Sequence, residues 1–366
     1  MTPVPARALL LVPGGFALLA GLDAALLLLG LPAPVDTSRL PEVHGVLLVL
    51  GFVGTLVALE RAVAAARRWA YLAPALLGAG AVVLVSPASR TAAGALLVAG
   101  STALAAVYVP LWRRSNDPAV LVQAAGAVLA AGAALLWLAD VPVPDLLPWL
   151  CGFLILTIAG ERLELARVTM LGTRAQPWLV TIAGAMVAAT VATLLWPNVG
   201  HRLLGLALLA LVAWLVRFDV ARRTVRADGQ ARFMALCLLA GYAWLTVPGL
   251  TWSLTGAAAA GGAYDAVVHS VMLGFVMSMI MAHASVILPA VVRRPLPYTP
   301  LMYGPAALLH GSLLLRVAGD VGGSDPAVDV GGALGIVAIL AFVGVALWSA
   351  LRRPVPTQIG TREVSA

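Results

Sequence analysis

The chain has 366 residues, of which 61% are hydrophobic and 11% are charged, and its mean hydropathy is +0.99. This balance excludes a water-soluble globular domain, and the continuous apolar runs exclude a β-barrel, whose strands alternate apolar and polar residues. The formal net charge of +7 is typical of the cytoplasmic loops of a membrane protein and does not indicate a nucleic-acid partner. The two cysteines, Cys151 and Cys237, lie in predicted helices and form neither a disulfide framework nor a zinc motif.

Apolar runs bounded by prolines, glycines and charges predict an all-α polytopic membrane protein, with residues 1–366 in one integral membrane domain. Each run is long enough to cross the roughly 30 Å hydrocarbon core of a bilayer. The twelve predicted spans lie at about 8–30, 43–65, 69–87, 91–112, 117–139, 146–168, 176–196, 201–219, 231–256, 265–290, 298–318 and 330–351. The connections are short, so neighbouring helices are expected to run antiparallel, and the main partner is the lipid bilayer.

Arginines gather on one side of this predicted bundle, and aspartates gather on the other. The arginine side carries Arg67–Arg68, Arg113–Arg114, Arg167, Arg174, Arg217, Arg222, Arg223, Arg226, Arg232, Arg293–Arg294 and Arg352–Arg353. The opposite loops carry Asp36, Asp140, Asp145, Asp265, Asp320, Asp325 and Asp329, with Arg39, Arg90 and Arg202. The positive-inside rule then predicts that both termini are cytoplasmic.

A short pattern recurs in every fourth span. Spans 2, 6 and 10 read "GFVGTLVALER", "GFLILTIAGER" and "GFVMSMIMAHA", so that an ionisable residue follows each Gly-Phe pair at the same distance. These residues are Glu60, Glu161 and His283. The recurrence predicts three four-helix units, at about 8–112, 117–219 and 231–351, around a pseudo-threefold axis. It also places the three ionisable residues at one depth, about 13 Å inward of the glycines.

Two histidines occupy the outer ends of spans 2 and 10. His44 and His269 are expected within roughly 3 Å of the same membrane depth, because each lies a few residues before its Gly-Phe pair. Two imidazoles from different helices are what a bis-imidazole haem requires, with one on each face of the porphyrin. Below His44, the same helical face carries Gly51, Thr55 and Ala58, small residues that leave room for a flat ring or for a close helix.

These segments resemble the NnrS family of bacterial membrane proteins. The resemblance is carried by "FALLAGLDAALLLLGLP" and "PEVHGVLLVLGF" near the amino terminus, and by "YDAVVHSVMLGFVMSMIMAHASVILPAVVRRPLPYTPLMYGPAALLHGSLLLRV", which holds His269, Gly274 and Arg316. It implies haem and copper binding, a link to nitric oxide, a bacterial cytoplasmic membrane and a plan similar to the main subunit of haem–copper oxidases. In that subunit, helices 2 and 10 hold the low-spin haem, which would be haem b here.

The sequence also departs from both families. The NnrS motif in span 2 has two histidines and a glutamate, whereas here His44 stands alone, with Glu42 before it. The copper-ligating histidines that oxidases carry on helices 6 and 7 have no counterpart in this chain. The resemblance therefore supports a haem site more than it supports an enzyme.

Other residues have candidate roles around these ligands. Glu42 and Asp265 could orient the ring nitrogens of His44 and His269, and Arg316 could clamp haem propionates or extend towards the membrane surface. His283 and His310 could meet within the membrane and hold copper beside the methionines of span 10, or could be hydrogen-bonded core histidines.

Charged residues at the inner ends of spans 2 and 6 have two interpretations. They are Glu60, Arg61, Glu161, Arg162 and Glu164. They could form neutralised pairs that join helices, or a proton or ion route from the cytoplasm.

Three functions compete at this stage. The first is a haem-binding NnrS-type protein that handles nitric oxide or a related redox partner. The second is a twelve-helix secondary transporter of small solutes, in which six-plus-six symmetry would pair span 2 with span 8. The third is a membrane scaffold without a cofactor. Only the haem hypothesis predicts that substituting His44 and His269 removes a cofactor from an intact fold.

Overall fold

The computed structural model describes residues 6–166, 174–293 and 295–352. Among them, twelve helical segments are long and apolar enough to cross a membrane, which confirms the twelve predicted spans. They are Arg7–Leu28, Arg39–Ala65, Arg68–Val85, Arg90–Ser115, Pro118–Leu138, Val143–Leu165, Ala175–Leu195, Pro197–Phe218, Gly229–Thr255, Gly261–Val291, Pro300–Gly322 and Asp325–Leu351. We number these spans 1 to 12; Arg167, Arg294 and Arg353 of the predicted arginine side, and the predicted end of span 6 at 167–168, lie outside the described residues.

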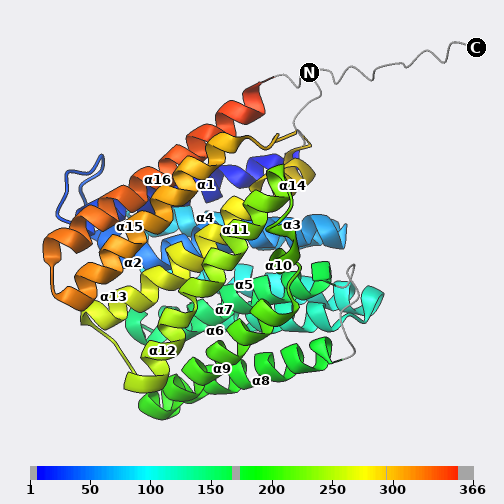
Figure 1. Ribbon diagram of the computed structural model, residues 1–366, viewed down its shortest axis with the longest axis horizontal. Coiled ribbons are helices and arrows are strands. Elements are labelled where there is room, and N and C mark those ends of the chain that lie inside the picture. The colour runs from blue at the N-terminus through cyan, green and yellow to red at the C-terminus, as the bar shows by residue number, and fades with distance from the viewer. Residues whose placement is uncertain (1–5, 167–173, 294, 353–366) are drawn as a thin grey trace, which may run out of the picture.

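The spans are built from sixteen α-helices and five shorter helical pieces within the described part of the chain (Figure 1). The α-helices are α1 (Leu11–Leu28), α2 (Arg39–Val46), α3 (Gly54–Ala65), α4 (Leu72–Val85), α5 (Arg90–Ser115), α6 (Pro118–Leu138), α7 (Val143–Ala166), α8 (Ala175–Leu195), α9 (Pro197–Phe218), α10 (Ala221–Thr224), α11 (Gly229–Trp244), α12 (Thr246–Thr255), α13 (Gly261–His269), α14 (Ser278–Val292), α15 (Tyr303–Gly322) and α16 (Asp325–Leu351). The others are the 3₁₀ helices η1 (Ala6–Leu10), η3 (Arg68–Tyr71) and η6 (Pro300–Met302), and the π-helices η2 (Leu47–Val53) and η5 (Ser270–Met277).

Helices that follow one another in the chain pack side by side, and α1 also contacts α16. Spans 2, 6 and 10 lie inside this arrangement. Of their most apolar stretches, 72%, 72% and 61% of the residues are buried, whereas the other described spans range from 33% to 56%. Across the centre, α14 contacts α3, and η5 contacts α7. Spans 2, 6 and 10 therefore form the interior of the bundle.

The surrounding spans present apolar side chains outward. Leu19, Val128, Leu206 and Leu340 are each 45% or more exposed on spans 1, 5, 8 and 12. Exposed apolar surface of this extent is unfavourable in water and favourable against lipid tails. The protein is therefore a multi-pass membrane protein whose outer helices contact the bilayer.

The repeated Gly-Phe glycines let neighbouring helices approach. A Cβ atom on Gly51 would lie 2.8 Å from the Cβ of Ala81, and one on Gly152 would lie 2.5 Å from a methyl carbon of Leu129. A Cβ on Gly274 would lie 2.4 Å from the indole of Trp244. Small residues at helix interfaces allow such contact in membranes. At Gly51, the small face below His44 therefore accommodates span 3 rather than a flat ring.

Spans 2 and 10 share a second feature, which is a π-helical stretch. In the described residues, π-helical hydrogen bonding is found at η2 and η5, and both stretches contain a "LGFV" sequence. The stretch η2 begins three residues after His44, and η5 begins directly after His269. Each π-helical turn accommodates an extra residue and is found most often beside functional sites. The corresponding part of span 6 lies within the single α-helix α7.

Candidate functional site

The structure places candidate residues at both ends of the bundle. We call the end that carries His44 and His269 the histidine end, and the end that carries Arg67, Arg113 and Arg217 the arginine end. The histidine end is the one predicted to face outward. Each end holds a separate cluster of polar side chains.

His44 at the histidine end is held by span 1. Its Nδ1 lies 3.0 Å from the carbonyl oxygen of Gly21, and the residue is partly buried. Because a carbonyl oxygen can only accept, Nδ1 carries the proton and donates it. The other ring nitrogen, Nε2, therefore keeps its lone pair in neutral His44, and the described residues offer it no hydrogen-bond donor. Glu42, the predicted partner of His44, has an exposed side chain.

His269 has the same orientation but a different partner. Its Nδ1 lies 2.9 Å from the backbone oxygen of Asp265, four residues earlier, and 3.2 Å from the carboxylate of the same residue. Both partners are acceptors, so Nδ1 again carries the proton, and the Nε2 of neutral His269 keeps its lone pair. A carboxylate on the far nitrogen of a ligating histidine fixes its tautomer and raises its basicity. Asp265 is positioned for this role.

Arg316 completes this cluster from span 11. Its Nε and Nη2 donate to the two carboxylate oxygens of Asp265 at 2.7 and 2.8 Å, a bidentate pair. Span 12 makes room for the guanidinium, because a Cβ on Gly332 would lie 2.5 Å from Nη1 of Arg316. Two of the donors of Arg316 are thus engaged by Asp265, whereas the sequence suggested that Arg316 clamps haem propionates or extends towards the membrane surface.

The two histidines belong to one cluster. His44 lies close enough to His269 and Arg316 for positive charges on these groups to repel one another, although the three residues come from spans 2, 10 and 11. A bis-imidazole haem requires two neutral imidazoles with available nitrogen lone pairs, supplied by different helices. The donor chemistry of His44 and His269 fits this requirement.

His283 and His310, the predicted copper pair, have other partners. His283 donates from Nδ1 to the carbonyl oxygen of Met279 at 2.9 Å, and its Nε2 accepts from Nη1 of Arg162 at 3.2 Å. His310 accepts from the indole N–H of Trp244 at 3.0 Å, so its proton lies on Nε2, 3.5 Å from the hydroxyl of Ser278. The lone pairs that copper would need are engaged. No group of three or more His, Cys, Asp or Glu suited to a metal is found among the described residues.

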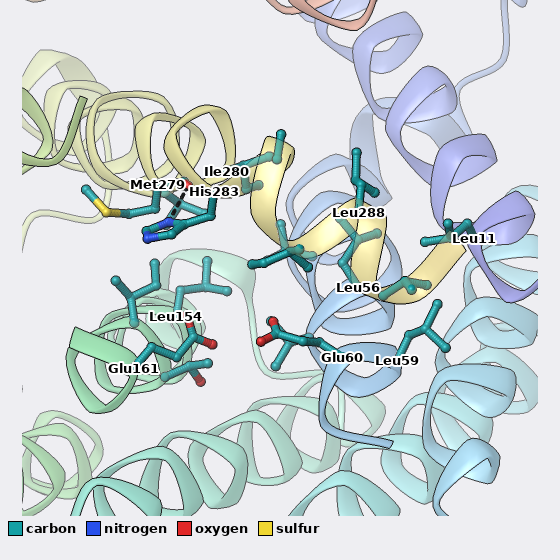
Figure 2. Close-up of a pocket in the computed structure, with 18 residues that line it drawn as sticks. Leu11, Leu56, Leu59, Glu60, Leu154, Glu161, Met279, Ile280, His283 and Leu288 are labelled. Carbon is teal, nitrogen blue, oxygen red and sulfur yellow. Dashed lines mark hydrogen bonds between the residues drawn. The ribbon is translucent and has the colours of Figure 1, made fainter. Parts of the chain in front are cut away.

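A cavity lies between the three central spans, on the arginine side of the π-helical stretches. It has a volume of about 120 Å³ and is lined mainly by spans 2, 6 and 10, with Leu11 from span 1. Figure 2 shows Glu60 and Glu161 extending into this space from α3 and α7, while His283 reaches it from α14. The residues that follow the three Gly-Phe pairs thus line one cavity.

Arg61 joins the carboxylates at this cavity. It pairs closely with Glu60, lies 4.0 Å from Glu161 and 3.7 Å from Glu164, and donates to the side-chain oxygen of Gln123 at 3.1 Å. These contacts connect spans 2, 5 and 6. One guanidinium therefore serves three carboxylates, of which Glu164 is about half exposed and the other two are mostly buried.

Arg162 forms a second, balanced network next to the cavity. Its Nε and Nη2 donate to the two carboxylate oxygens of Asp219 at 2.7 and 3.0 Å. The hydroxyl of Tyr242 donates to the same carboxylate at 2.8 Å. The side chains of Arg162 and Asp219 are 3% and 0% exposed. This network joins spans 6, 9 and 10 to the end of span 8.

Several of these partners were not among the predicted site residues. Asp219 lies among arginines at the end of an apolar span, so its sequence context is that of a solvated loop. Gln123 is a lone amide within the apolar run of span 5, and an isolated polar residue in a membrane helix indicates a buried contact. The sequence alone could therefore have indicated Gln123. It could not have indicated the Gly21 carbonyl that holds His44, because every residue has a backbone carbonyl.

Comparison with known families assigns the chain to one family. The family described as Domain of unknown function (DUF8744) matches residues 7–351, from the start of span 1 to the end of span 12. The chain belongs to this family. No curated protein and no solved structure gives a significant match. The family description names no activity, so the similarity to NnrS proteins stays a resemblance.

Proposed function

We propose that this protein binds haem b at the histidine end, with the Nε2 atoms of His44 and His269 as axial ligands, and that it handles nitric oxide or a related redox partner as NnrS-type proteins do. The observation that carries this proposal is that the two imidazoles have the same tautomer, with the proton on Nδ1. Both histidines donate from Nδ1 to carbonyl oxygens and present a free Nε2 lone pair, and both lie at the histidine end of the bundle. The proposed location is a bacterial cytoplasmic membrane, with both termini on the cytoplasmic side.

The chain's own residues would hold and tune such a group. Gly21 fixes the tautomer of His44, and Asp265 fixes that of His269 while its charge is balanced by Arg316. A haem with two imidazole ligands supplies one-electron redox chemistry at the iron. Copper at His283 and His310 is not part of this proposal, because both histidines are engaged elsewhere.

The test is an absorption spectrum of the full-length protein, purified in detergent from cells supplied with haem, before and after reduction by dithionite. We expect a Soret band, with sharp α and β bands on reduction, that is lost in His44→Ala and in His269→Ala. His201→Ala is the matched control, because His201 has the same Nδ1 bond to a carbonyl oxygen, that of Pro197, but lies in span 8. A featureless spectrum from folded protein, or bands that survive both ligand substitutions, would overturn the proposal.

Secondary transport is the second candidate, and the cavity at the arginine end favours it. A space between helices, with ionisable groups in its wall, is typical of solute sites in membrane transporters. However, the cavity is lined by spans 2, 6 and 10, whereas six-plus-six symmetry would have paired span 2 with span 8. The cavity therefore supports a transporter, but the helices that line it do not follow the six-plus-six symmetry expected of one.

A further inference from the structure

The cavity at the arginine end combines an apolar wall with carboxylates. Fourteen of its eighteen lining residues are apolar, and the other four are Glu60, Thr157, Glu161 and His283. His283 is held neutral by its two hydrogen bonds, so the ionisable groups that give the cavity its charge are the two glutamates. Figure 2 shows that their carboxylates enter the cavity from two different helices.

The two glutamates in the wall of this cavity share one guanidinium. Glu60 and Glu161 both pair with Arg61, whereas Glu164 lies further out and is about half exposed, so water screens its charge. On the remaining sides, the charge of Arg162 is matched by Asp219, and Arg7 donates to the backbone carbonyls of Ala290 and Val291 at the edge of the cavity. One of the two carboxylates in the wall is therefore left without a guanidinium of its own. An uncompensated buried charge costs several kcal/mol, so the site is stabilised by whatever supplies positive charge there.

A second observation points to a missing partner. Tyr108 of α5 is 2% exposed, and its hydroxyl has no hydrogen-bond partner among the described residues. The hydroxyl interacts electrostatically with Arg61 and with all three glutamates. A buried hydroxyl without a partner is unfavourable. Tyr108 does not line the cavity itself, so its hydroxyl is available to a donor in the charged cluster around Arg61 and not to one in the apolar part of the cavity.

The chemistry of the wall decides which cation fits. A metal ion needs several oxygen or nitrogen ligands, and the described residues contain no group of three or more that could hold one. An apolar wall also disfavours a strongly hydrated ion but suits a hydrocarbon body. The volume of about 120 Å³ is close to that of the engineered apolar cavity of about 150 Å³ that binds benzene.

We propose that this cavity binds a small organic ammonium ion, with a hydrocarbon body about the size of benzene against the apolar wall and its charge at Glu60 and Glu161. The ammonium N–H groups donate to these carboxylates. The site lies at the opposite end of the bundle from His44 and His269, so this proposal does not depend on haem binding.

The test is calorimetric titration of the full-length protein in detergent micelles with benzylammonium and with benzyl alcohol, its neutral counterpart of similar size. Heats measured with empty micelles are subtracted. We expect saturable binding of benzylammonium at least tenfold tighter than that of the alcohol, because a charge pair worth about 1.4 kcal/mol changes affinity tenfold.

Three variants make the test specific. Glu161→Gln should weaken benzylammonium binding at least tenfold, and Ala284→Leu, which fills the cavity without changing its charge, should also weaken it. Glu164→Gln is the matched control, because Glu164 is on the same helix but outside the cavity wall, and its affinity should stay within twofold of wild type.

Three outcomes would overturn the proposal. The first is equal binding of the amine and the alcohol, which would make the cavity merely apolar. The second is undiminished amine binding in Glu161→Gln. The third is no saturable binding of benzylammonium to folded protein. In that case, a pH-dependent melting temperature that Glu161→Gln abolishes would show that a proton neutralises the glutamates.

Discussion

The two ends of the bundle solve the problem of buried charge in different ways. At the histidine end, Asp265 and Arg316 form a bidentate pair, with Asp320 as a second carboxylate beside Asp265, and both histidines have a fixed tautomer. At the arginine end, Arg162 and Asp219 are equally balanced, but Arg61 is shared among three glutamates. Balanced pairs hold helices together, whereas an excess of one sign leaves a site that can accept a counter-ion. The comparison separates charges that maintain the fold from charges available for binding.

The largest expected effect tests a balanced pair. Asp219→Asn leaves the guanidinium of Arg162 buried without its carboxylate, and breaking a buried pair typically costs about 3–5 kcal/mol. We expect a marked fall in the melting temperature of the purified protein. Asp228→Asn is the control, because Asp228 is an exposed aspartate in the same connection between spans 8 and 9. Equal melting temperatures for the two variants would contradict the structural role of Asp219.

A smaller loss is expected at the histidine end. Asp265 is one quarter exposed, so water compensates part of the loss in Asp265→Asn, and we expect a destabilisation of about 2 kcal/mol. The double variant Asp265→Asn with Arg316→Met removes both charges and should recover part of the melting temperature. If the double variant is no more stable than the single one, the pair does not act as a unit.

The variant with the smallest expected effect on stability separates the two kinds of charge most clearly. Glu161→Gln removes one of the carboxylates that share Arg61, so the free energy of unfolding should stay within about 0.5 kcal/mol of wild type or increase. The same carboxylate-to-amide change thus has opposite consequences at Asp219 and at Glu161. A loss at Glu161 as large as that at Asp219 would mean that Glu161 maintains the fold.

The sequence predicted the spans well because apolar length dominates in a bilayer. The largest differences are at helix starts. Span 2 begins at Arg39 rather than near residue 43, since the guanidinium of Arg39 donates to the carbonyl of Leu84 at 2.7 Å. Span 12 begins at Asp325 rather than near residue 330, where acidic residues in the first turn are favourable. Polar residues can thus extend a helix beyond its apolar run.

The candidate sites were less predictable than the spans. The equal spacing after the Gly-Phe pairs indicated that Glu60, Glu161 and His283 share a depth, and all three line one cavity. The partner of Arg162 could not be predicted, because Asp219 reaches it only through the packing of span 8. For the same reason, spacing left open whether His283 and His310 meet or are separate hydrogen-bonded core histidines, and in the structure His310 accepts from Trp244. Residue depth can be read from the chain, but the partner depends on how helices rotate against one another.

The π-helical stretches bear directly on that rotation. Spans 2 and 10 each carry an ionisable group on both sides of a π-helical stretch: His44 and Glu60 in one, His269 and His283 in the other. In an α-helix each residue turns the chain by about 100°, so removing one residue from η2 or η5 would swing one group away while the other stayed in place. The stretches therefore act as angular adjustments that let a single helix serve two separate sites at once.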